Sequence, residues 1–260
     1  MAKPEIGLSM LYRLGWDFNE SLNEVTKQGV KFIEVVDDGL HKLDKRRVSQ
    51  LLELCSSHGL QYSIHAPFGD INIASLSKPL LKAMIKRLQK SIVNAGALEA
   101  RIWVLHPGME TGISMFYPGR AWSQNLKTVE QLYNFARDYG VKIAVENIPE
   151  PSPFLMKSIE HFQKFYEEVD CEIGLALDIG HANISGKTEL FIEKFRDKIV
   201  HIHAHDNKGK FDEHLGIGRG TVNWERIAKM LKEIAYDKTV VVESIEHVPE
   251  SIRILKTLLV

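Results

Sequence analysis

Histidines and carboxylates recur at the ends of short apolar runs along this chain of 260 residues. The phrases YSIHAPF, WVLHPG, IAVENIP, LALDIGHA, VHIHAHD and VVVESIE each place such residues directly after a hydrophobic stretch. Together with the phrase DEH, these runs supply nine candidate metal ligands: His65, His106, Glu146, Asp178, His181, His203, Asp212, His214 and Glu243. Because imidazole and carboxylate groups bind divalent metal ions, the set predicts a metal centre.

Each of these histidines alone has a simpler explanation, since an imidazole at a strand end often serves only as a hydrogen-bonding group. The carboxylates of Glu146, Asp178 and Glu243 are different, because a buried and unpaired charge costs several kcal/mol. Pairing with Arg or Lys is the alternative, but neither residue type occupies these strand ends. We therefore expect cations to neutralise the cluster.

The chemistry of the donors narrows the choice of metal. Five imidazoles and four carboxylates are too rich in nitrogen for a dedicated Mg²⁺ or Ca²⁺ cage. Zn²⁺ or Mn²⁺ is expected, with Fe²⁺, Co²⁺ or Mg²⁺ as alternatives. Nine ligands exceed the needs of one ion, so we expect two or three divalent ions, bridged by Glu146 or Glu243, that polarise oxygen atoms of a substrate.

The elements that must position these side chains alternate between short apolar runs and longer amphipathic stretches. The pattern predicts eight strands: Glu5–Met10, Lys31–Val36, Gln61–His65, Ile102–His106, Lys142–Glu146, Gly174–Asp178, Ile199–His203 and Thr239–Glu243. A helical stretch follows each strand, and examples are Asp44–His58, Lys78–Asn94 and Ala121–Tyr139. Gly59 and Gly140 are expected to stop the first and the last of these helices.

This order predicts an α/β fold, a single (β/α)8 TIM barrel over residues 1–260. In such a barrel the carboxyl ends of all strands meet at one mouth, so ligands far apart in the sequence share one site. A doubly wound sheet is the alternative, but SMLYRLGWD after the first strand lacks a phosphate-binding glycine pattern. The GIGRG stretch at Gly216–Gly220 precedes a helix and is interpreted as a shaped loop.

Other residues near this mouth are candidates for substrate contact. By strand alternation His201 and His205 share the face of His203, with His201 in the core and His205 close enough to the mouth to reach a substrate. Glu34 ends the second strand and either faces the pocket or accepts a hydrogen bond inside the barrel. The remaining substrate candidates are Phe68, His181, Lys208 and Arg219. The other histidines are expected to be solvated: His41, His58, His161 and His247.

The composition is that of an ordinary soluble chain, with 44% hydrophobic and 26% charged residues, which argues against disorder, collagen and coiled coil. Lys and Arg (33) nearly balance Asp and Glu (34), so no overall positive field favours nucleic acid. Cys55 and Cys171 are too few for a disulfide framework, and we find neither a signal peptide nor a membrane span. A cytoplasmic protein is expected, and nothing specifies or excludes a homo-oligomer.

The phrases HAPFGDINIAS, VLHPG, VENIP, LDIGHANISG, HIHAHDNKGKFDEHLGIGRGTVNW and VVVES resemble the xylose isomerase-like TIM-barrel superfamily over nearly the whole chain. That superfamily contains sugar isomerases and epimerases, including proteins labelled sugar phosphate isomerase/epimerase. It also contains the endonuclease IV enzymes, AP endonucleases of DNA repair. The resemblance therefore implies a metal-dependent enzyme without choosing one reaction.

Resemblance to the epimerase branch implies that one divalent ion is held by Glu146, Asp178, His203 and Glu243. Glu146 and Glu243 would exchange protons with a carbon acid through a metal-stabilised enediolate, and His181 would contact the sugar. An Arg common in these epimerases, six residues after the strand-7 His, is replaced here by Gly209. Resemblance to endonuclease IV implies instead that all nine ligands hold three zinc ions for phosphodiester hydrolysis.

The parts of endonuclease IV that contact duplex DNA match poorly. Phe68 and Gly69 stand where that enzyme places large side chains that wedge the duplex. VDDGLHKLD is acidic where a phosphate would lie, and the cations Lys208, Lys210 and Arg219 suffice for one phosphate group. We therefore expect an isomerase or epimerase of a small sugar or sugar phosphate. An endonuclease IV-like phosphodiesterase acting on duplex DNA is the alternative, and a non-catalytic, metal-stabilised barrel is a third reading.

Overall fold

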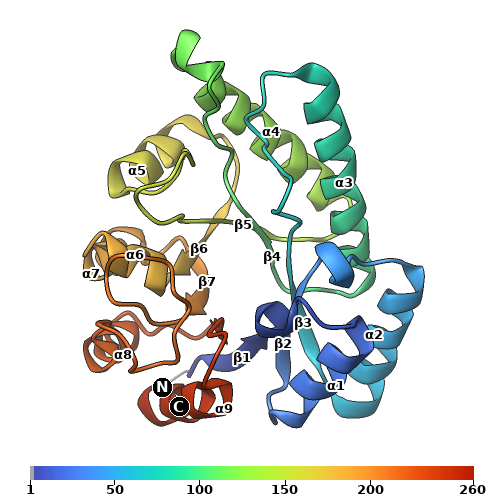
Figure 1. The fold of residues 1–260 in the computed structure, drawn as a ribbon, viewed down its shortest axis with the longest axis vertical. Coiled ribbons are helices and arrows are strands. Elements are labelled where there is room, and N and C mark those ends of the chain that lie inside the picture. The colour runs from blue at the N-terminus through green and yellow to red at the C-terminus, as the bar shows by residue number, and fades with distance from the viewer. Residues whose placement is uncertain (1–2) are drawn as a thin grey trace.

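A closed barrel of parallel strands forms the centre of the computed structural model, which describes residues 3–260 (Figure 1). Within these residues the strands follow one another around the barrel in sequence order: β1 (Glu5–Ser9), β2 (Phe32–Val36), β3 (Gln61–His65), β4 (Trp103–Leu105), β5 (Ile143–Glu146), β6 (Gly174–Asp178), β7 (Ile199–Ala204) and β8 (Thr239–Val242). β1 pairs with both β2 and β8, which closes the sheet. The predicted TIM barrel is confirmed, and the doubly wound alternative is wrong. Met1 and Ala2, which the predicted domain includes, lie outside the described residues.

The strands are apolar on both faces because helices cover the outside and side chains fill the inside. All five residues of β2, for example, are buried. β4 ends one residue earlier than predicted, at Leu105, and β8 ends at Val242. His106 and Glu243 therefore lie directly after the last paired residues, at the carboxyl end of the barrel.

Helices surround the barrel and connect its strands (Figure 1). In the described part of the chain they are α1 (Phe18–Lys27), α2 (Lys45–His58), α3 (Lys78–Ala97), α4 (Arg120–Arg137), α5 (Ile159–Glu168), α6 (Ile179–Ile184), α7 (Thr188–Phe195), α8 (Trp224–Glu233) and α9 (Val248–Leu259). Three short 3₁₀ turns are η1 (Met10–Arg13), η2 (Gly39–His41) and η3 (Ser114–Phe116). Among residues 3–260, no helix has both the length and the apolar character needed to cross a membrane.

The ends of the helices follow their capping residues. Asp44 caps α2 by accepting a hydrogen bond from the backbone N–H of Arg47, and Gly59 ends this helix in the left-handed conformation, as predicted. α4 ends at Arg137 rather than at Tyr139, and Gly140 follows in a turn with a φ of 68°. The lengths of the helices are thus close to the predicted ones, with shifts of a few residues at the ends.

The main hydrophobic core lies between the barrel and its helices, and alternation along each strand separates it from the barrel interior. On β4, Trp103 and Leu105 belong to this core, whereas Val104 joins a small separate cluster with Ala144 and Ala176. Ala144 and Glu146 share one face of β5. The same face that is apolar deep in the barrel therefore carries a carboxylate at the carboxyl end.

The histidines expected to be solvated do not all lie in solvent. His58 and His247 are exposed, but His41 in η2 is fully buried, so that prediction was wrong. Its Nε2 lies 3.2 Å from the carbonyl oxygen of Trp16, and its ring meets the ring of Phe18 edge to face. The 3₁₀ turn after β2 rotates the imidazole inward, where these two neighbours replace water. His161 is half-buried and completes the N-terminal cap of α5.

Candidate metal centre

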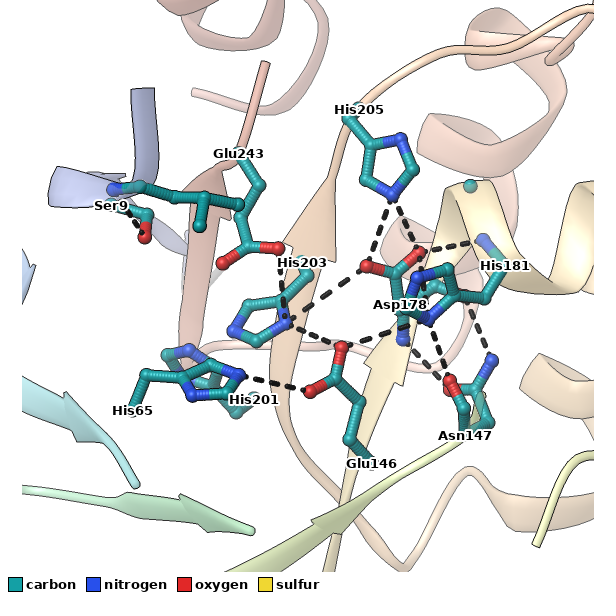
Figure 2. A network of polar contacts seen from close by, with 12 residues as sticks. Ser9, His65, Glu146, Asn147, Asp178, His181, His201, His203, His205 and Glu243 are labelled. Atoms are coloured by element: carbon teal, nitrogen blue, oxygen red, sulfur yellow. Dashed lines mark hydrogen bonds and ion pairs between the residues drawn. The ribbon is translucent and has the colours of Figure 1, made fainter. Parts of the chain in front are cut away.

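All nine predicted ligands lie together at the carboxyl end of the barrel, and most of them are visible in Figure 2. Their donor atoms fall into three groups, and within each group all donor atoms are within 4.8 Å of one another. We call these the first group (His65, His106, Glu146), the central group (Glu146, Asp178, His203, Glu243) and the third group (His181, His205, Asp212, His214). Glu146 belongs to both the first and the central group. His205, predicted as a substrate contact, lies inside the third group.

The first group brings two imidazoles to one carboxylate oxygen. The Oε2 atom of Glu146 lies 3.4 Å from Nε2 of His65 and 3.1 Å from Nε2 of His106. This oxygen is buried, yet it has no hydrogen-bond partner among the described residues. The Nδ1–H of His65 donates to the carbonyl oxygen of Ala66 at 2.9 Å, so a neutral ring presents its Nε2 lone pair to Glu146. A cation between these atoms would satisfy all three of them, so the donors fit a metal ion.

The central group is almost completely buried, with each side chain at most 4% exposed. Nδ1 of His203 lies 3.0 Å from Oε1 of Glu146, 3.5 Å from Oε2 of Glu243 and 3.9 Å from Oδ2 of Asp178. Oδ1 of Asp178 accepts a hydrogen bond from the backbone N–H of His181 and thereby caps α6. Three carboxylates around one imidazole form an environment in which a divalent cation balances the charge.

Asn147 holds the ends of two strands in place and was missed by the sequence reasoning. Its side-chain amide donates to the carbonyl oxygen of Asp178 and accepts from the backbone N–H of Asp178, at 3.0 and 2.8 Å. Its own carbonyl oxygen accepts a hydrogen bond from Nδ1 of His181 at 2.8 Å. A single residue therefore orients one ligand of the central group and one of the third. The only signal was its place beside Glu146 in the phrase VENIP.

Glu34 lies in a fully buried layer inside the barrel, next to His201 and His203. Its Oε2 accepts hydrogen bonds from Ser63 and His201, each at 2.9 Å. Its Oε1 makes an ion-pair contact of 2.9 Å with Nε2 of His203. Glu34 was expected either to face the pocket or to accept a hydrogen bond inside the barrel, and these contacts correspond to the second role. His201 is part of the core, as expected. The contact between Nε2 of His203 and Glu34 leaves Nδ1 of His203 facing the central group.

A loop between β7 and α8 carries two ligands of the third group. Asp206 and Leu215 form a two-way backbone bridge at 2.9 and 2.8 Å, which closes the segment that holds Asp212 and His214. The buried carboxylate of Asp206 accepts four hydrogen bonds, including those from Gly218 and Trp224. His214 has a φ of 47°, a conformation that costs energy in a residue with a Cβ and that is common at functional sites. These contacts hold the loop that carries Asp212 and His214 against the barrel.

Burial and charge set the protonation of the site when no cation is bound. Burial alone opposes the charged imidazole, but neighbouring carboxylates outweigh it and raise the pKa of His65 to about 9, of His181 to about 10 and of His214 to about 9. Burial alone would raise the pKa of Glu146 and Asp212, yet adjacent imidazoles hold both below their usual range. A cation and these protons therefore compete for the same nitrogen lone pairs.

The remaining substrate candidates lie at different distances from the ligands. The half-buried ring of Phe68 is 5.1 Å from the ring of His65 and 5.3 Å from that of His106, beside the first group. Lys208 and Arg219 are exposed and make ion pairs with Glu213 and Glu250. The structure therefore places Phe68 among the ligands, whereas both of these cations pair with acidic residues outside the three groups.

The acidic segment after β2 has partners of its own. Asp37 is buried, and its carboxylate forms a two-pronged pair with Arg87 of α3 at 2.7 and 3.1 Å. Asp38 accepts hydrogen bonds from the backbone N–H groups of Phe68 and Gly69, at 2.9 and 2.8 Å. Asp38 therefore holds the loop after β3 in position beside the first group, and Asp37 ties the segment after β2 to α3. Arg87 was missed because it stands 50 residues away from Asp37 in the chain.

Residues 22–258 match the model of the xylose isomerase-like TIM barrel family. This chain belongs to that family. The predicted resemblance is thereby confirmed, and the matched range contains the positions of all nine predicted ligands.

Individual relatives of this xylose isomerase-like barrel point in two directions. A solved structure of a D-tagatose 3-epimerase-like protein is 31% identical, with a TM-score of 0.92 over 98% of this chain and 96% of that chain. An uncharacterised protein of Methanocaldococcus jannaschii is 32% identical over 244 residues, 92% of this chain and 83% of that protein. A probable endonuclease 4 of Staphylococcus epidermidis is 26% identical over 181 residues, 63% of this chain and 59% of its own. Other solved structures with this fold include sugar 3-epimerases at 20% identity or less.

Proposed function

We propose that this xylose isomerase-like barrel is a divalent-metal-dependent isomerase or epimerase that acts on a small sugar or sugar phosphate. The observation that carries the proposal is the central group, in which two buried glutamates share one set of donors with Asp178 and His203. Glu146 comes from β5 and Glu243 from the end of β8, so they approach the group from different sides (Figure 2). The similarity to a D-tagatose 3-epimerase-like protein over 98% of the chain supports it.

The central group has the side chains that proton exchange at carbon requires. A divalent cation held by Glu146, Asp178, His203 and Glu243 would supply Lewis acidity to neighbouring carbonyl and hydroxyl oxygens of a sugar, which makes the adjoining C–H bond more acidic. One of the two glutamates takes the proton from that carbon, and the other returns a proton to it. The half-buried ring of Phe68 offers an apolar surface beside the ligands on which a sugar can pack.

Exchange of carbon-bound hydrogen for deuterium tests this reaction directly. Metal-loaded protein is incubated in D₂O with a panel of ketoses and ketose phosphates, and deuterium in the recovered sugar is measured by mass spectrometry. We expect exchange, and we expect Glu243→Gln to lower its rate by about 10²–10⁴-fold with folding retained, the usual contribution of a general acid or base. Glu233→Gln, an exposed change on α8, is the matched control. Absence of exchange across the panel, or an unchanged rate in Glu243→Gln, would refute the proposal.

A second candidate function is phosphodiester hydrolysis by an endonuclease IV-like site. The observation in its favour is that the first and third groups flank the central group, so that all nine ligands implied by that resemblance come together. Against it, the loop around Phe68 is held by acidic Asp38, and Lys208 and Arg219 are engaged by glutamates. Nicking of a duplex with one abasic site, tested with Zn²⁺-loaded protein, would replace the first proposal by this one.

A further inference from the structure

The third group contains one donor more than the nine that the sequence predicted. His205 follows His203 by two residues, directly after β7, and is fully buried. Its Nε2 lies 3.6 Å from Oδ1 of Asp212, and 3.1 and 3.2 Å from the two carboxylate oxygens of Asp178 (Figure 2). Its ring stacks on the ring of His214 with the centroids 3.9 Å apart. Neither the proposed proton exchange nor the alternative hydrolysis assigns a role to this imidazole.

The spacing of the donors in the third group is that of ligands around one zinc ion. Four ligand atoms placed about 2.0–2.1 Å from Zn²⁺ in a tetrahedron lie about 3.3–3.4 Å from one another. Oδ2 of Asp212 lies 3.2 Å from Nε2 of His181 and 3.2 Å from Nε2 of His214, and Oδ1 lies 3.6 Å from Nε2 of His205. Two imidazoles therefore stand close to the expected ligand-to-ligand distance from one oxygen of this carboxylate, and the third lies about 0.2–0.3 Å beyond it from the other oxygen.

The orientation of the rings of His181 and His214 presents Nε2 of each to a cation. Nδ1 of His181 donates to the carbonyl oxygen of Asn147 at 2.8 Å, and Nδ1 of His214 donates to that of Glu243 at 3.0 Å. Nδ1 of His205 faces the carbonyl oxygen of Asp206 at 3.5 Å. A carbonyl oxygen only accepts, so the contacts of His181 and His214 fix the proton on Nδ1 and leave the lone pair on Nε2, the usual arrangement of a metal-bound histidine. Nε2 of His205 faces Asp178 instead, so binding of a cation there requires the proton of His205 to move to Nδ1, which faces Asp206.

The neighbouring backbone makes room for this fourth donor. Gly180 is the second residue of α6, and a Cβ at this position would overlap the imidazole of His205. The residue has no positive φ that would require glycine, so the space for the ring is the reason that the structure shows for a glycine here. The first turn of α6, which also carries His181, is therefore shaped around His205.

We propose that His205 is a protein ligand that closes a four-donor zinc site together with His181, Asp212 and His214. Three imidazoles and one carboxylate suit Zn²⁺, and four protein ligands leave no position for a substrate. Such a closed site acts as a structural cross-link, because it joins the start of α6 to the residue after β7 and to the loop that carries Asp212 and His214. The central group also offers four donors, but three of them are carboxylates, which suit an ion of higher coordination number such as Mn²⁺, so the open positions needed for a reaction remain there. This inference goes beyond the proposed function and does not depend on it.

Diffraction from crystals of the unmodified protein soaked in Zn²⁺, collected at the zinc absorption edge, tests the proposal without any variant. We expect an anomalous peak in the third group, with Nε2 of His205 about 2.0–2.1 Å from the ion, like the other three donors. No peak in this group, or a peak bound by His181, Asp212 and His214 with Nε2 of His205 out of bonding range, would overturn it. In the second case His205 would only donate a hydrogen bond to Asp178.

Two variants test the same site in solution. His205→Gln removes the nitrogen donor, and Gly180→Ala displaces the ring while every ligand stays in the chain. After dialysis against buffered Zn²⁺, we expect each to bind the third-group ion at least about 10–100-fold more weakly, since loss of a mere outer-shell partner already has that effect. Gly112→Ala, where a Cβ meets no atom within 4 Å, is the matched control for the glycine change. Zinc content and affinity equal to those of the unmodified protein in both variants would contradict the proposal.

Discussion

Replacement of Glu34 with Gln tests whether the layer inside the barrel orients the central group. Gln keeps the shape of the side chain but removes its charge and turns one acceptor oxygen into a donor. That carboxylate now accepts hydrogen bonds from His201 and Ser63 and makes an ion-pair contact of 2.9 Å with His203. All three partners are fully buried, so water cannot replace what the substitution removes.

Two magnitudes follow from these contacts. Removal of one partner from a buried ion pair costs about 3–5 kcal/mol, so we expect the free energy of unfolding of the metal-free protein to fall by about that amount. Loss of the carboxylate that supports a metal-bound histidine weakens metal affinity about 10–100-fold, which corresponds to about 1.4–2.7 kcal/mol. Both effects have one cause, because His203 loses the group that holds Nε2 and directs Nδ1 towards Glu146.

Urea unfolding of chelator-treated protein measures the first magnitude, and competition with a metal-chelating dye measures the second. Glu5→Gln is the matched control: Glu5 lies at the opposite end of the barrel in a surface pair with Arg101, which is worth at most about 1 kcal/mol. If Glu34→Gln leaves the metal affinity equal to that of the parent protein, Glu34 does not orient His203. If the stability falls but the metal affinity does not, the role of Glu34 is limited to stabilising the core.

Two further measurements probe the competition between protons and cations and the loop that Asp206 holds. In the metal-free protein the pKa of His65 is raised to about 9 and that of His181 to about 10. The ion pairs of these two imidazoles therefore stabilise the fold fully below about pH 6.5, and this stabilisation is lost as the pH rises through the two raised values. We expect the Tm of chelator-treated protein to fall from pH 7 to pH 10 while the gain in Tm on adding Zn²⁺ increases, and a gain independent of pH would contradict this. Asp206→Asn places an amide among four N–H donors, so we expect a loss of about 1.5–3 kcal/mol in unfolding free energy together with weaker zinc binding in the third group only. Denaturant unfolding and zinc titration check this result, and an equal loss at the first group would show that the whole mouth had been disturbed.

The barrel and the convergence of the nine ligands could be predicted from the sequence because both follow from local rules. Apolar runs of strand length alternate with amphipathic helices, and a parallel barrel brings every carboxyl strand end to one mouth. A residue such as Glu146, at the end of IAVE, must therefore lie at this mouth. The same reasoning placed His201 in the core, since it shares the face of His203 but lies deeper.

The division of the ligands into three groups at the mouth depends on contacts between residues far apart in the sequence, which local sequence patterns do not reveal. His205 lies on the expected face, but its place in the third group depends on the space that Gly180 leaves, and the two are 25 residues apart. The pairing of Asp37 with Arg87 joins β2 to α3 across 50 residues and neutralises an acid that the sequence presented as free. His41 was taken for a surface residue because a short 3₁₀ turn, which leaves no periodic pattern, rotates it against Phe18.

The sharing of Glu146 between the first and the central group has a consequence for how the site fills. A cation placed on one side of this carboxylate withdraws charge from the oxygen that faces the other side, so the affinity of the second position depends on whether the first is occupied. By thermodynamic reciprocity each ion changes the affinity of the other by the same factor. We therefore expect protein prepared at low and at high metal concentration to differ in the number of bound ions and also in the strength with which each ion is held.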